Sequence, residues 1–214
     1  MTRVKICGIT SLGDAELAMK SGADFLGFVN ARNSPRFLTP ERISGIVSSL
    51  KSKVPTVLVT HSQSLEEILD SFVRSGTDIL QIHAPLKIVE YVKMKDEAKI
   101  IANISIPSTL EKATDGLVKR VEVVSEICDF ILFDTEVGGR IGGTGRTFHW
   151  SVAKELRSYC RKPVFLAGGL KPENVAIPLR EVNPYAVDVS SGVESSPGKK
   201  DPQKVRDFIN AVKG

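Results

Sequence analysis

The chain has 214 residues, of which 42% are hydrophobic, with 29 basic against 25 acidic side chains and a formal net charge of +4. It contains no run of about 18 apolar residues, which excludes an ordinary transmembrane helix, and we expect neither a signal peptide nor membrane association. Because the charges are well mixed, a nucleic-acid surface is not indicated, whereas an anionic small molecule is compatible with the composition.

Cysteine usage and the lack of linkers bear on compartment and domain number. No Pro- or Gly-rich stretch marks a boundary, so residues 1–214 are predicted to form a single domain. Cys7, Cys128 and Cys160 are odd in number and widely spaced, which favours free thiols over a disulfide framework or a metal site. We therefore expect a cytoplasmic protein in which Cys128 and Cys160 pack inertly within helical segments.

Short β-branched runs alternate with amphipathic stretches eight times along the chain. The expected strands are 3–8, 24–29, 54–59, 78–82, 98–104, 129–134, 163–168 and 185–190. Strands in such an alternation cannot be joined by tight hairpins, so they should be parallel, with right-handed helical crossovers. Eight units favour an α/β fold of the (β/α)8 TIM barrel type, with eight parallel strands and outer helices. An open doubly wound sheet is the alternative that periodicity leaves standing.

A helix is expected after each strand, and two are marked most clearly. The first is 64–75 and the second 202–212, and their apolar stripes are Leu65, Ile68, Leu69, Phe72 and Val73, and Val205, Phe208, Ile209 and Val212. Start signals accompany several helices: Ser64 with Glu67 has the pattern of a capping box. The pairs Thr39-Pro40, Lys171-Pro172 and Asp201-Pro202 are typical of proline at a first helical position.

Polar side chains stand at the ends of the expected strands, on the face that alternation turns inward. In chain order they are Cys7, sharing its face with Lys5, then Gln81 and His83, Asp134, and Asp188 with Ser190. The lower layers of a barrel are packed apolar side chains, and its chemistry belongs at the carboxyl ends of the strands. Polar groups gathered there are explained better by a ligand than by folding, and a thiol with a carboxyl suggests a base and an acid facing one pocket.

Glycine-containing turns follow the last three strands. They are Gly142-Gly143-Thr144-Gly145, Ala167-Gly168-Gly169-Leu170 and Ser190-Ser191-Gly192. Glycine lets backbone N–H groups approach a ligand closely, and the loops after the seventh and eighth barrel strands commonly hold a phosphate. The residues predicted to bind phosphate are Gly143, Gly145, Gly168, Gly169, Ser190, Ser191 and Gly192. Turn geometry alone is the other reading of these glycines.

Seven segments of the chain form a distinctive series. In order they are Val4-Lys5-Ile6-Cys7-Gly8-Ile9-Thr10, Ser34-Pro35-Arg36, Gln81-Ile82-His83, Phe133-Asp134-Thr135, Gly142-Gly143-Thr144-Gly145, Leu166-Ala167-Gly168-Gly169-Leu170 with Pro172-Glu173-Asn174-Val175, and Val187-Asp188-Val189-Ser190-Ser191-Gly192-Val193-Glu194. Together they resemble the phosphoribosylanthranilate isomerase family of tryptophan biosynthesis. The resemblance implies an Amadori rearrangement of N-(5-phosphoribosyl)anthranilate to 1-(2-carboxyphenylamino)-1-deoxyribulose 5-phosphate on a (β/α)8 barrel, without a cofactor or metal. The chain departs from the family pattern at 30–32, Ala84 and His149, which bears on loop shape.

The same resemblance assigns Asp134 as the general acid, Cys7 as the general base and Arg36 as the ligand of the anthranilate carboxylate. A carboxyl of ordinary pKa about 3.9 must then keep its proton near neutrality, and a thiol of about 8.5 must lose one. Burial would raise the first pKa, and Lys5 or backbone N–H groups could lower the second. A helix cap for Asp134 and a solvated loop cation for Arg36 are the structural alternatives.

Two further side chains are predicted to contact substrate. His83 is expected to line the pocket by hydrogen bonding, since no second metal ligand lies at short spacing. Asp188 is expected to orient a hydroxyl or nitrogen of the substrate, or else to be a barrel-layer carboxylate balanced by Lys5.

Two other functions remain open from the residues. One is a different sugar-phosphate isomerase or aldolase, which would need a Schiff-base lysine or paired metals, and the other is a non-enzymatic phosphosugar-binding protein, which would not need both Cys7 and Asp134. We expect a small-molecule phosphosugar-anthranilate substrate, with neither nucleic acid nor membrane as a partner, and a monomer or small homo-oligomer.

Overall fold

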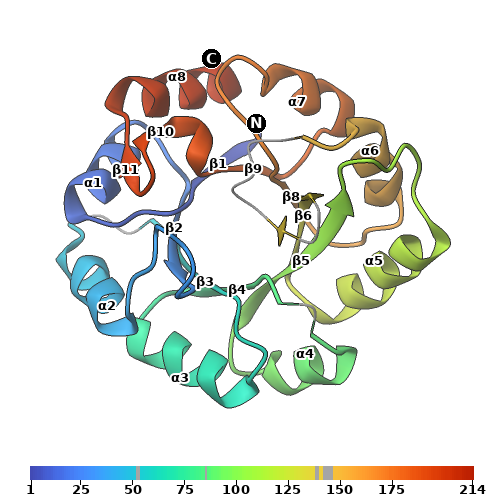
Figure 1. Ribbon diagram of the computed structural model, residues 1–214, viewed down its shortest axis with the longest axis horizontal. Coiled ribbons are helices and arrows are strands. Elements are labelled where there is room, and N and C mark those ends of the chain that lie inside the picture. Colours follow the sequence, from blue (N-terminus) through green and yellow to red (C-terminus); the bar gives the residue numbers. More distant parts are fainter. Residues whose placement is uncertain (52–53, 85, 138–139, 142–146) are drawn as a thin grey trace.

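Eight parallel strands close into a barrel in this computed structural model, which describes residues 1–51, 54–84, 86–137, 140–141 and 147–214 (Figure 1). The barrel strands are β1 (Arg3–Ile6), β2 (Phe25–Asn30), β3 (Thr56–Thr60), β4 (Ile79–Ile82), β5 (Lys99–Pro107), β6 (Phe130–Val137), β8 (Val164–Leu166) and β9 (Ala186–Val189). Each pairs in parallel with its neighbours, and β1 pairs with β9 to complete the ring. The predicted barrel is thus confirmed, and the open sheet is wrong.

Helices surround the barrel, and Figure 1 shows them as an outer ring in chain order from blue to red. Within the described residues they are α1 (Leu12–Lys20), α2 (Pro40–Ser49), α3 (Leu65–Ser75), α4 (Ile88–Met94), α5 (Asp115–Ile127), α6 (Trp150–Ser158), α7 (Ala176–Val182) and α8 (Pro202–Lys213). The last helix contacts the first, so the helical layer closes where the strands do. No helix of the described part is long and apolar enough to cross a membrane.

Most of the expected helix-start signals are confirmed, and two are wrong. The Ser64 hydroxyl accepts from the Glu67 N–H, but the Glu67 carboxylate accepts from the Ser62 hydroxyl, so only half of the capping box forms. Pro172 is not a first helical residue, because α7 begins at Ala176. The Asn174 side chain accepts from the Lys171 N–H and donates to the Gly169 carbonyl, which holds the chain in a turn before that helix.

Three residues that were expected on the buried face or within a helix lie elsewhere. Val73, expected in the apolar stripe of α3, is 76% exposed. Cys128 is the residue that follows α5, and Cys160 follows α6 by two positions, so neither thiol lies within a helix. Cys128 is nevertheless fully buried, which agrees with a packing role.

Several short elements lie beyond the eight β/α units. β5 and β6 run past the expected ends because their parallel ladder continues to Pro107 and Glu136, and β6 then pairs antiparallel with β7 (Arg140–Ile141). After β9 come the 3-10 turn η1 (Ser191–Val193) and an antiparallel hairpin of β10 (Glu194–Ser196) and β11 (Lys199–Lys200). Elements of two or three residues carry no periodicity, so the sequence pattern did not predict them.

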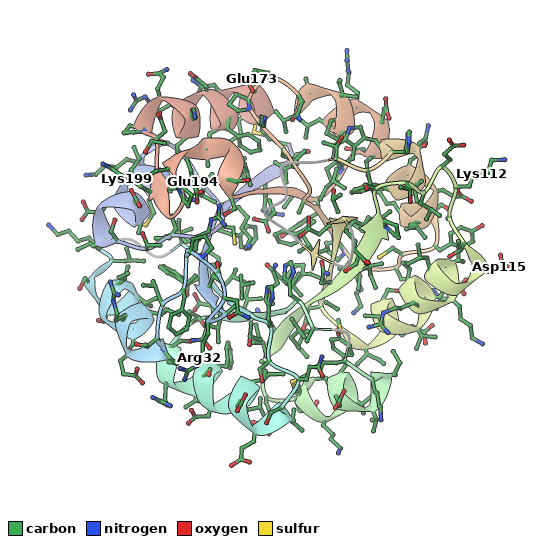
Figure 2. The ribbon with its side chains drawn as sticks, viewed as in Figure 1. Arg32, Lys112, Asp115, Glu173, Glu194 and Lys199 are labelled. Carbon is green, nitrogen blue, oxygen red and sulfur yellow. The ribbon has the colours of Figure 1, made fainter. Side chains whose placement is uncertain are left out.

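The core has two layers, as the alternation of β1 requires. Val4 and Ile6 face the helices, and Lys5 and Cys7 face the barrel interior, as predicted. The interior is filled by aromatic and β-branched side chains, including Phe25 and Phe165, whose ring centroids are 5.2 Å apart. Figure 2 shows the charged side chains of Lys112 and Asp115 at the periphery. The packed interior leaves the carboxyl ends of the strands as the place where polar groups meet.

Candidate active site

A cavity of about 950 Å³ opens at the carboxyl ends of the barrel strands. Ten of the predicted site residues line it together: Cys7, Arg36, His83, Asp134, Gly168, Gly169, Asp188, Ser190, Ser191 and Gly192. The remaining two, Gly143 and Gly145, lie outside the described residues. The thiol and the carboxyl singled out from the sequence therefore share one cavity.

A buried ion pair lies beside the thiol of Cys7. The Lys5 side chain is fully buried, and its Nζ donates to Asp188 Oδ2 at 2.9 Å. A Cβ on Gly27 of β2 would lie 2.8 Å from Cys7 Sγ and 3.0 Å from Lys5 Nζ, so the missing side chain leaves room for both. Burial opposes the ammonium form, but the charges of Asp188 and Cys7 raise the pKa of Lys5 above its ordinary value.

The thiol is less acidic than the sequence led us to expect. Burial raises the pKa of Cys7, and the opposing effect of Lys5 does not overcome it, partly because Asp188 also raises it. Lys5 does lower the pKa of Cys7, as expected, but the net change is upward. The reason is that burial disfavours the thiolate more strongly than the charge and hydrogen bond of Lys5 favour it.

Asp134 has the proton affinity that an acid near neutrality needs. It lies in β6, is 4% exposed, and burial raises its pKa to about 7. The Thr135 N–H donates to Asp134 Oδ1 at 2.7 Å and lowers the pKa in part, while Asp188 raises it. Because the strand continues to Val137, Asp134 caps no helix.

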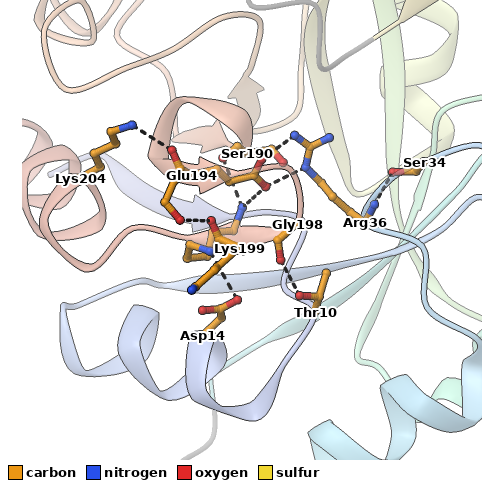
Figure 3. A network of polar contacts seen from close by, with 11 residues as sticks. Thr10, Asp14, Ser34, Arg36, Ser190, Glu194, Gly198, Lys199 and Lys204 are labelled. Carbon is orange, nitrogen blue, oxygen red and sulfur yellow. Dashed lines mark hydrogen bonds and ion pairs between the residues drawn. The ribbon is translucent and has the colours of Figure 1, made fainter.

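Arg36 reaches the cavity from the loop after β2 and is held by a carboxylate (Figure 3). Its Nε donates to Glu194 Oε1 at 2.8 Å, and its Nη2 donates to Glu194 Oε2 at 2.7 Å. The side chain is 12% exposed, so it is not a freely solvated cation. Glu194 belongs to the last of the motif segments, but the sequence pattern did not predict this pairing, which joins residues 158 positions apart.

Two histidines and an amide form one wall of the cavity. Gln81 Nε2 and His83 Nε2 are 2.8 Å apart, and the His61 and His83 rings stack with centroids 5.0 Å apart. Burial lowers the pKa of His83 to about 3, with smaller contributions from His61 and Lys5, so this ring is neutral. His61 follows β3 directly, and its place one residue beyond a strand was the signal that could have identified it.

Strands β6 and β9 and the residue that follows β9 carry buried polar atoms near this end of the barrel. Within the described residues, Thr135 Oγ1, Ser190 Oγ and Asp188 Oδ1 are buried without a hydrogen-bond partner. Gly168 and Gly169 have φ of 100° and 62°, which side chains rarely adopt. Asp188 and Ser190 line the cavity, and buried polar atoms without partners are costly, so a polar ligand there would supply the missing hydrogen bonds.

The whole chain has close relatives of one kind. A family model described as N-(5'phosphoribosyl)anthranilate (PRA) isomerase matches residues 4–211. The N-(5'-phosphoribosyl)anthranilate isomerases of Geobacter metallireducens and Thermotoga neapolitana are 39% and 40% identical, with 100% of both chains covered in each case. The crystal structure of phosphoribosyl anthranilate isomerase from Thermotoga maritima is similar with a TM-score of 0.88 at 37% identity, covering 100% of both chains. Another, in complex with reduced 1-(o-carboxyphenylamino)-1-deoxyribulose 5-phosphate, has a TM-score of 0.85 at 36% identity and the same coverage.

Proposed function

The chain belongs to the N-(5'-phosphoribosyl)anthranilate isomerase family and is such an isomerase of tryptophan biosynthesis. On this basis we propose that Cys7 is its general base and Asp134 its general acid. The reaction converts N-(5-phosphoribosyl)anthranilate to 1-(2-carboxyphenylamino)-1-deoxyribulose 5-phosphate by an Amadori rearrangement. The observation that carries the assignment is that a thiol and a carboxyl with a pKa of about 7 line one cavity.

Asp134 acts first in this proposal. A carboxyl with a pKa of about 7 keeps a substantial protonated fraction at neutral pH, so it can donate a proton to the ring oxygen of the ribose. Protonation opens the furanose ring, and the anilinic nitrogen and the anomeric carbon then form a Schiff base. The carboxylate left behind is buried, which makes return of a proton to it favourable at the end of the cycle.

Cys7 acts on the carbon next to the Schiff base. A thiolate removes the proton from that carbon, and the electron pair moves into the carbon–nitrogen system to give an enolamine, which becomes the ketone. Because burial raises the pKa of Cys7, the thiolate is a minor form in the resting site. The nearby Lys5 ammonium lowers the cost of forming it, since a positive charge stabilises the anion that appears.

The two anionic ends of the substrate define the remaining roles. Arg36 is proposed to bind the anthranilate carboxylate. The phosphate is proposed to bind the loops that contain Gly168, Gly169 and Ser190–Gly192. His83 lines the wall, and Asp188 orients a substrate hydroxyl or nitrogen through the oxygen that Lys5 does not use. Gly143 and Gly145 are proposed phosphate contacts on sequence grounds alone.

The oligomeric state and the cellular compartment of this protein are also proposals. A structure of a relative at 36% identity is described as mutually generated monomers of a dimeric phosphoribosylanthranilate isomerase from Thermotoga maritima. For this chain we propose one domain over 1–214, in a monomer or a small homo-oligomer in the cytoplasm. Light scattering on the purified protein distinguishes the two states of assembly.

The direct test follows loss of the substrate's fluorescence as the purified protein turns it over. We expect Asp134→Asn to lower kcat by about two to four orders of magnitude, because an amide cannot deliver the proton. Binding of the product-like reduced ligand should change much less. A variant that keeps near-normal turnover would remove Asp134 as the acid.

A further inference from the structure

The β10–β11 hairpin carries two buried charges for which the reaction has no direct use. Glu194, the first residue of β10, is 7% exposed, and Lys200, the last residue of β11, is 2% exposed. Charged side chains are seldom buried this deeply unless they are paired. Figure 2 shows Glu194 nearer the barrel centre than the peripheral charges.

Glu194 is the centre of a three-residue ion cluster. Its Oε1 accepts from both Arg36 Nε and Lys200 Nζ, the latter at 2.9 Å, and its Oε2 accepts from Arg36 Nη2 (Figure 3). Burial opposes ionisation, but Arg36 and Lys200 hold the pKa of Glu194 below its usual range, so it is a carboxylate. Two cations against one anion leave the cluster with a net positive charge beside the cavity.

The geometry of the guanidinium decides what Arg36 can still bind. Glu194 occupies the edge formed by Nε and Nη2, and among the described residues no acceptor takes the donors of the opposite Nη1 end. A Cβ on Gly8, whose φ is +74°, would lie 2.4 Å from Arg36 Cδ, so the chain leaves room there for this side chain. The Arg36 guanidinium is thereby held in one orientation before a ligand binds.

The same cluster reaches the loop proposed to hold phosphate. Lys200 Nζ donates to the Ser190 carbonyl at 3.2 Å as well as to Glu194. At the hairpin tip the Gly198 carbonyl accepts from the Thr10 hydroxyl at 2.6 Å. The hairpin thus joins the loops after β1, β2 and β9.

We propose that Glu194 and Lys200 are positioning residues for the substrate. Glu194 fixes Arg36 with its free end toward the anthranilate carboxylate, and Lys200 ties Glu194 to the Ser190 loop, which sets the distance between the carboxylate and phosphate subsites. This inference rests on the proposed role of Arg36, and neither residue touches the reacting atoms.

The primary test is Glu194→Gln, measured by steady-state kinetics and by competitive inhibition with anthranilate. A glutamine presents an amide NH2 to one of the Arg36 donors, so the fork is no longer held by two acceptors. We expect KM and the anthranilate inhibition constant to rise about tenfold, with kcat changed by less than about threefold. Glu126→Gln makes the same change at an exposed pair with Arg161 and should leave all three values unchanged.

A double-mutant cycle separates positioning from general damage. In the Arg36→Ala background, Glu194→Gln should add little to the increase in KM, because the group that it positions is already gone. Additive increases in KM would overturn the inference. Tighter anthranilate binding by Glu194→Gln would also overturn it, because Glu194 would then compete with the substrate for Arg36.

One further variant, a double replacement, keeps the test decisive. Glu194→Gln leaves Lys200 buried without its anion, so the combination with Lys200→Met, which removes both charges, serves if the single variant does not fold. Its KM should rise similarly, and inorganic phosphate should inhibit it more weakly. If Arg36→Ala leaves anthranilate inhibition unchanged, the proposed role of Arg36 fails; if only Glu194→Gln has no effect, the positioning role alone is wrong.

Discussion

Burial has opposite chemical consequences for the two proposed reacting groups. It raises the pKa of Asp134 to about 7 and also raises that of Cys7. For the acid, the higher pKa keeps the proton available near neutrality. For the base, it reduces the fraction of the reactive thiolate. The buried Lys5–Asp188 pair beside Cys7 therefore matters, since Lys5 lowers the pKa of the thiol and Asp188 raises it.

Replacing the sulfur tests the base directly. We expect Cys7→Ser to lower kcat by at least about a hundredfold while the affinity for anthranilate stays within about twofold, because an alcohol is far less acidic than a thiol. Steady-state kinetics and anthranilate inhibition measure the two quantities. Near-normal turnover in the serine variant would show that another group removes the proton.

Lys5→Met tests how the thiolate is stabilised. Loss of the ammonium should raise the pKa of Cys7, because the remaining Asp188 carboxylate acts in the same direction as burial. We expect iodoacetamide to alkylate Cys7 several-fold more slowly at pH 8 than in the parent protein. The experiment uses a Cys160→Ser background, because Cys160 is partly exposed whereas Cys128 is buried with a pKa of about 12.

Lys20→Met is the matched control for that experiment, since Lys20 forms an exposed pair with Glu16. Its alkylation rate should equal that of the parent. An unchanged rate in Lys5→Met would show that the backbone around Cys7, and not Lys5, governs the thiol.

At the scale of elements, strands were predictable where their side chains report on an interior. Each barrel strand lies within a few residues of its expected range. A barrel with an apolar interior and a solvent-exposed end requires β-branched runs that end in polar residues, and the sequence shows that pattern. The β10–β11 hairpin left no such pattern, because its two strands are three and two residues long. The turn at Pro172 was misread because Asn174, not the proline, organises it.

The strand β8 offers a test of interior packing. Phe165 is fully buried, and its ring lies 5.2 Å from that of Phe25 and 5.5 Å from that of Phe130. We expect Phe165→Ala to lower the free energy of unfolding by about 3–5 kcal/mol, because it leaves a cavity among three rings. Val73→Ala on the exposed side of α3 should change it by less than about 0.5 kcal/mol in the same urea titration. Equal effects would mean that the barrel interior relaxes around the loss.

At the scale of the whole molecule, closing the barrel is what assembles the site. Lys5 meets Asp188 across 183 residues and Arg36 meets Glu194 across 158, and both contacts form where the last β/α unit returns to the first. Side-chain alternation predicted which residues face inward, but not which of them pair. Pairing depends on register and on the hairpin after β9, which periodicity does not encode.

Closure also makes the global stability depend on the protonation of Asp134. Its pKa is about 7 in the folded protein against 3.8 for an ordinary Asp, so between these values the native state holds a proton that the unfolded chain has released. Stability from this residue is therefore fully present below pH 3.8 and is lost as the pH rises through 7. The loss amounts to roughly 4 kcal/mol, at about 1.4 kcal/mol per pKa unit.

Asp134→Asn removes this dependence, because an amide does not titrate. We expect the difference in unfolding free energy between the variant and the wild type to grow in favour of the variant by roughly 4 kcal/mol between pH 4 and pH 8. Urea unfolding of both proteins across that range measures it, and the difference cancels the other titrating groups that both proteins share. A difference that is flat with pH would show that Asp134 is already ionised in the native state at pH 5, and would remove it as an acid that keeps its proton near neutrality.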